Sequence, residues 1–105
     1  MAWVYLVLAG VFEVVWASTM KQSAGFTKLA PTIITLVTMT ISFGLLALAM
    51  KSLPLGTAYA IWTGIGAVGA FLVGILLLGE AATLFRIVSV SLIIAGLIGL
   101  KLSTP

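Results

Sequence analysis

The chain has 105 residues, of which 63% are hydrophobic and 7% are charged. In an average soluble domain about 25% of the residues are charged, so this chain is expected to be an integral membrane protein. Two glutamates are its only acidic residues, and it has no histidine or cysteine, so the composition excludes disulfides and thiol chemistry and predicts neither an enzyme nor a metal or cofactor site. The formal charge of +3 comes from five basic residues that stand singly, which favours anchors at the membrane ends over a nucleic-acid surface.

The apolar residues divide into four segments, each close to the roughly 20 helical residues that cross a bilayer. Two of the breaks contain a proline, Pro31 or Pro54, which suits the first turn of the helix that follows. We therefore expect one all-α transmembrane domain over residues 1–105, with both termini on the same side of the membrane and connections too short for a soluble domain. The expected spans are residues 2–20, 31–50, 57–79 and 84–102.

The first span carries an acid, Glu13, in the stretch AGVFEVVWAS. A charged side chain at mid-membrane depth costs about 2.5 to 3.5 kcal/mol on insertion scales, and ionisable residues there are functional by default. Gly10 and Trp16 lie three residues away on the same helix face, so the glutamate has a small residue and an indole beside it. Glu13 is either a protonated structural group or a carboxylate for which a proton and a cation compete, which is the physical basis of proton-coupled antiport.

The second and third spans offer further side chains to the same cavity. Ser42 is a weak candidate, because hydroxyls in membrane helices often bond their own backbone. Tyr59 and Trp62 form an aromatic stripe that either attracts a cation or belongs to an interfacial belt. Gly64 and Gly66 beside this stripe predict either close helix packing or a bend in the third helix.

The fourth span carries no acid. Its Ser91, Ala95 and Gly99 repeat every four residues, a pattern typical of helix association, so we expect this helix to form the dimer contact. Lys101 at its end is most simply an anchor that reaches the membrane surface. Glu80, in the preceding connection, is expected to be solvated.

The basic residues are nearly balanced between the two sides of the membrane. One side has Lys21, Lys28 and Arg86. The other has Lys51, Lys101 and the N-terminal amine, so the positive-inside rule gives no strong orientation. Many transporters alternate access by exchanging two inverted repeats, and the two halves of this chain show no convincing repeat. Two copies inserted in opposite directions would supply the inversion, which predicts a dual-topology, antiparallel homodimer.

Three features together resemble the small multidrug resistance family of four-helix, proton-coupled exporters over essentially the whole chain. They are the single glutamate of the first helix, KQSAGFTKLAP at residues 21–31 and PLGTAYAIWTGIG at residues 54–66. Within that family, EVVWA, the threonines of GTAYAIWTG and the terminal GLKLS are similar to the guanidinium-exporter subgroup.

The resemblance implies that Glu13 binds proton and substrate in turn and that Lys101 joins a polar network near it. Guanidinium suits such a site, because a carboxylate can bind it bidentately while an indole covers its face. The residues implied or expected to line the site are Gly10, Trp16, Ser42, Tyr59 and Trp62.

We therefore expect an antiporter that exchanges guanidinium-type cations for protons across the bacterial inner membrane. An alternative within the same family is an exporter of small quaternary ammonium cations. A dual-topology ion channel and a non-transporting accessory subunit are further alternatives, although the accessory subunit leaves Glu13 unexplained.

Overall fold

The computed structural model describes residues 1–104 and consists of helices, as expected from the composition. Each of the four is long and apolar enough to cross a membrane, which confirms the all-α membrane fold. The helices are α1 (Ala2–Gln22), α2 (Leu29–Ala49), α3 (Leu55–Leu77) and α4 (Leu84–Ser103).

The helix ends differ from the expected spans at the breaks. Pro31 lies in the first turn of α2, which begins two residues earlier at Leu29. Pro54 directly precedes α3 as its N-cap and is not inside its first turn. At the other end of α3, Gly79 has a φ of +71°, a conformation that glycine adopts without strain and that commonly ends a helix.

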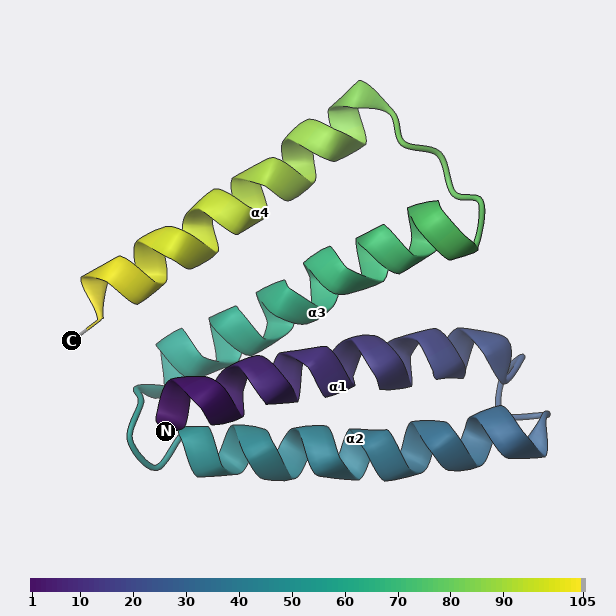
Figure 1. The fold of residues 1–105 in the computed structure, drawn as a ribbon, viewed down its shortest axis with the longest axis horizontal. Coiled ribbons are helices and arrows are strands. Elements are labelled where there is room, and N and C mark those ends of the chain that lie inside the picture. The colour runs from purple at the N-terminus through teal and green to yellow at the C-terminus, as the bar shows by residue number, and fades with distance from the viewer. Residues whose placement is uncertain (105) are drawn as a thin grey trace.

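The helices lie side by side in a slab whose Cα extents are 43 × 35 × 16 Å. Figure 1 shows their order across the slab as α2, α1, α3 and α4, with the two ends of the chain on the same side. The backbone of α1 packs between α2 and α3, whereas that of α4 approaches α3 alone within the described residues. The slab therefore has α1 near its middle and α4 at one edge.

The buried core lies where α1, α2 and α3 meet, and it includes Leu6, Ala9, Ile61 and Trp62. No residue of α4 is buried in the single chain. Most large apolar side chains on the outer faces are exposed, as expected where lipid replaces water as the solvent of a helix. The chain is a multi-pass membrane protein.

Candidate functional site

Glu13 lies near the middle of α1 and faces α3, where Gly66 leaves room for its carboxylate. A Cβ atom added at Gly66 would lie 2.6 Å from Glu13 Oε1 and 2.7 Å from Oε2. The Glu13 Oε2 atom is buried and has no hydrogen-bond partner among residues 1–104. The seam between α1 and α3 thus contains an open acceptor, which a proton or a donor-bearing cation can satisfy.

Ser42, on α2, connects three helices through its hydroxyl. The hydroxyl donates to the Ala9 carbonyl oxygen at 2.7 Å and accepts from Trp62 Nε1 at 3.0 Å, and both Ser42 and Trp62 are buried. Ala9 lies one helical turn before Glu13. The link therefore fixes α2 and α3 against the segment of α1 that carries the carboxylate.

Four aromatic rings form a row beside this link. Trp16 and Phe43 meet edge to face at 6.3 Å between centroids, and Phe43 meets Trp62 in the same way at 5.6 Å. Tyr59 continues the row at 5.7 Å from Trp62. The expected lining residues Trp16, Trp62 and Tyr59 thus lie in one row, in which Trp62 is buried among the helices and Tyr59 is half exposed.

Phe43 is the member of this row that the sequence did not predict. Consecutive residues of a helix point about 100° apart, so the helical pattern that brings Ser42 to the site does not by itself bring Phe43 there. Its ring is large enough to contact an indole on either side. The sequence feature that could have indicated Phe43 is the size of its side chain, because a phenylalanine next to a site residue can still reach the edge of the site.

Trp16 Nε1 is a second buried polar atom without a partner among the described residues. It is a donor, whereas Glu13 Oε2 is an acceptor, and the two residues lie three apart on one face of α1. Unpaired buried polar atoms are uncommon in native proteins. The two atoms lie on neighbouring turns of α1, one able to accept a hydrogen bond and the other to donate one.

The glycines near the site pack closely against side chains of other helices. A Cβ atom at Gly10 would lie 2.5 Å from Ile65 Cγ2, so Ile65 fills the space beside Gly10 in the single chain. A Cβ atom at Gly64 would lie 3.0 Å from Leu97 Cγ of α4. Helix α3 is continuous through Gly64 and Gly66; the lining role of Gly10 and the bend in α3 stay predictions.

The fourth helix presents different residues to α3 and to the outside. A groove of about 720 Å³ runs between α3 and α4 beside Tyr59, and Ile93 and Leu97 form its α4 wall. Ser91, Ala95 and Gly99 are exposed. They lie on the opposite side of α4 at 3.6 residues per turn, so the face expected to form a dimer contact is open in the single chain.

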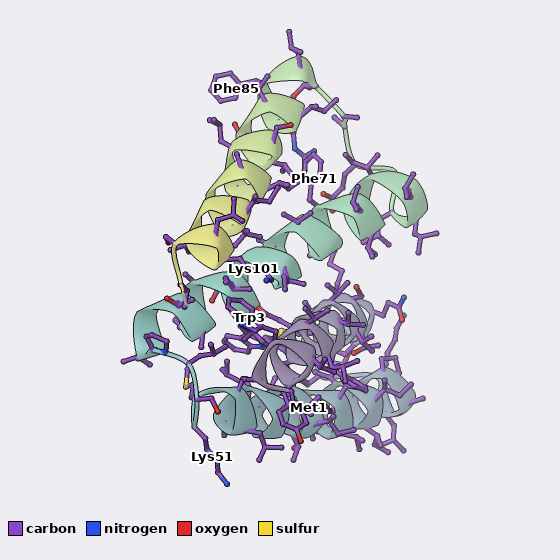
Figure 2. The ribbon with its side chains drawn as sticks, turned by 60° about the vertical axis from the view of Figure 1, so that its left-hand side comes forward. Met1, Trp3, Lys51, Phe71, Phe85 and Lys101 are labelled. Carbon is purple, nitrogen blue, oxygen red and sulfur yellow. The ribbon has the colours of Figure 1, made fainter. Side chains whose placement is uncertain are left out.

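Lys101 lies at the end of α4 close to the start of α1. Figure 2 shows it beside Trp3, and its Nζ lies 4.8 Å from the centre of the Trp3 ring, a cation–π contact. Trp3 is ten residues before Glu13, about 15 Å along the helix axis. The single chain therefore does not bring Lys101 to Glu13, and its place in a polar network stays a prediction.

Comparison with known proteins gives one consistent result. The family model described as Small Multidrug Resistance protein matches residues 1–93. A protein of Yersinia pestis named "Guanidinium exporter" is 64% identical, with 99% of this chain and 100% of the relative covered. Proteins of the same name from Escherichia coli (strain K12) and Citrobacter freundii are 60% and 59% identical, each with 99% of both chains covered.

Proposed function

The chain belongs to the small multidrug resistance family, and we propose that it exports guanidinium-type cations across the bacterial inner membrane in exchange for protons. Several relatives at about 60% identity are named as guanidinium exporters. The observation that carries the proposal is the Glu13 carboxylate, one oxygen of which is buried and has no hydrogen-bond partner in the described part of the chain. A carboxylate only accepts hydrogen bonds and guanidinium only donates them, so the two are complementary.

Coupling to protons follows from the charge of one group. Ionised Glu13 binds the cation through charge-assisted hydrogen bonds. Protonated Glu13 is neutral and loses most of that attraction. Binding a proton from outside therefore releases the cation there, and loss of the proton on the inside restores the carboxylate for the next cation.

We further propose that the working unit is an antiparallel homodimer. Trp16 Nε1, which has no partner within the described residues, supports this. An indole N–H needs an acceptor, which guanidinium lacks and the Glu13 carboxylate of a second copy would provide. The open face of Ser91, Ala95 and Gly99 on α4 supports a dimer contact there. Two copies of opposite orientation would form one site open alternately to the two sides.

Transport by purified protein in liposomes tests the proposed activity. We expect guanidinium uptake to be accelerated by an outward proton gradient and to be lost in Glu13→Gln. Tetraalkylammonium cations, which lack N–H donors, are expected to compete poorly. Uptake that ignores the gradient or survives in Glu13→Gln would refute the proposal, and strong competition by tetraalkylammonium would reassign the substrate class.

Opposite charge changes test the dual topology. Gln22→Arg with Ala82→Arg adds charge to one side, and Ser52→Arg with Ser103→Arg adds it to the other, so each double variant is expected to insert in one orientation. Each alone is expected to lose export, and co-expression of the two to restore it. Full export by either double variant alone would contradict an antiparallel dimer.

A further inference from the structure

The connection between α3 and α4 holds a guanidinium group of the protein itself, that of Arg86. Its Nη2 lies 3.2 Å from Glu80 Oε1, and its Nη1 donates to the Ala81 carbonyl oxygen. The guanidinium carbon lies 5.1 Å from the centre of the Phe71 ring, and Figure 2 shows Phe71 between α3 and the first turns of α4. A carboxylate and an aromatic face thus bind a guanidinium group here, the chemistry proposed for Glu13 and its indoles.

Glu80 is positioned by the end of α3. Its backbone N–H donates to the Gly74 carbonyl oxygen at 3.0 Å. Its carboxylate lies over Gly74, where an added Cβ atom would be 2.6 Å from Oε1 and 2.9 Å from Oε2. Glu80 was expected to be simply solvated, and its side chain is 44% exposed, yet this fixed placement makes it part of a built site.

The same carboxylate lines a cavity of about 160 Å³ between the ends of α1 and α3. Ala17 forms part of its α1 wall and Ala70 part of its α3 wall. These residues lie one helical turn beyond Glu13 and Gly66 respectively. The cavity therefore lies at the outer end of the seam that contains the Glu13 carboxylate.

We propose that Glu80 and Phe71 form a second, weaker guanidinium site at the membrane surface, which Arg86 occupies at rest and from which a free guanidinium ion displaces it. This inference rests on the proposed function, because it takes guanidinium as the ligand. The ion pair with Glu80 joins one nitrogen to one oxygen and is partly exposed, so it contributes little to holding Arg86 in place beside its contacts with Ala81 and Phe71. The free guanidinium ion that replaces Arg86 then lies beside Glu80, which also lines the cavity at this end of the α1–α3 seam.

Lys21 also lines the cavity and is the charged group opposed to this site. Its positive charge repels a cation at Glu80, so Lys21→Gln is expected to tighten guanidinium binding there. Arg86→Gln removes the internal competitor and is expected to tighten binding by about fivefold, the factor typical of losing one such contact. Glu80→Gln is expected to abolish it.

The test uses purified protein carrying Glu13→Gln, so that only the second site can bind. Guanidinium chloride is titrated while the Arg86 Nε–H and Glu80 amide signals are followed by NMR. Sodium chloride and tetramethylammonium chloride at the same ionic strength serve as controls for screening. We expect saturable shifts with guanidinium alone; equal shifts with all three salts, or none, would overturn the proposal.

A variant that keeps every charge separates the site from general electrostatics. Gly74→Ala displaces the Glu80 carboxylate and is expected to weaken guanidinium binding. Gly56→Ala is the matched control, because its added Cβ would meet no atom of another turn or helix within 4 Å among residues 1–104. Phe71→Leu is expected to weaken it as well. Unchanged binding in Gly74→Ala and Phe71→Leu would overturn the proposal.

Transport measurements keep this result distinct from the proposed function. With Glu13 intact, Glu80→Gln is expected to raise the KM for guanidinium and leave kcat unchanged, because the second site supplies the ion and does not move it. An unchanged KM would overturn the second site while export remained. Loss of Glu13-dependent export in the unmodified protein would instead contradict the proposed function.

Discussion

The Glu13 carboxylate fits into the α1–α3 seam because Gly66 of α3 has no side chain. It occupies the space that a Cβ atom at Gly66 would need. This fit explains why an acid can be placed in the α1–α3 seam without separating the helices. Because the Glu13 carboxylate packs against α3, a movement of α3 would change the space around the carboxylate.

Gly66→Ala tests this packing. The added methyl group displaces the carboxylate, and we expect guanidinium affinity to fall by at least about tenfold, which corresponds to 1.4 kcal/mol. Equilibrium binding to purified protein measures it. Gly56→Ala, on the same helix, is the control, because its added Cβ would meet no atom of another turn or helix within 4 Å among residues 1–104. Equal affinities for the two variants would contradict the packing described.

Ser42 and Trp62 are expected to be energetically coupled through their hydrogen bond. Ser42→Ala leaves the indole N–H of Trp62 buried without its acceptor, and Trp62→Phe removes that donor. Because such a bond contributes about 1 kcal/mol, the double variant should be more stable by about that amount than the sum of the single changes predicts. Reversible unfolding in detergent measures the cycle, and strictly additive effects would exclude the link.

Helix α3 uses different glycines for its two neighbours. Gly66 and Gly69 face Glu13 and Val14 of α1, whereas Gly64 faces Leu97 of α4. A helix with small residues on two faces can approach both neighbours closely. This arrangement places α3 between the site and the edge helix.

Gly64→Ala is therefore expected to push against Leu97 and to lower the free energy of unfolding by about 1 to 3 kcal/mol, the usual effect of overpacking. Leu97→Ala in the same chain removes the obstructing side chain and should recover part of that loss. Unfolding of the single and double variants in detergent gives the comparison. If the Gly64→Ala protein were as stable as the unmodified one, α4 would be able to move away from α3 without loss of stability.

The elements were predictable from sequence because lipid imposes long apolar helices and because a proline lies near the start of two of them. The glutamate was predictable because an acid in such a helix is conspicuous. Phe43 was not, since its apolar ring looks like any lipid-facing residue until α3 is placed beside it. The contact of Lys101 with Trp3 was also hidden, because a single sequence does not show which ends of helices far apart in the chain meet.

At the level of the whole molecule, α4 is the helix without a buried residue. Ala95→Phe places a large ring on its open small-residue face, and we expect it to shift the protein from dimer to monomer in detergent. Leu36→Phe, at an exposed apolar position of α2, is the control. Analytical ultracentrifugation reports both, and an Ala95→Phe protein that remains dimeric at the same dilution would place the contact elsewhere.

The claim that a proton and the cation share Glu13 is tested most directly by guanidinium binding to the purified protein as a function of pH. Protonation neutralises the carboxylate, so affinity must fall as pH falls, approaching about tenfold per pH unit for each competing proton. Glu13→Gln should bind guanidinium at this site weakly at every pH. An affinity that stays constant across the acidic range in the unmodified protein would contradict exchange at Glu13.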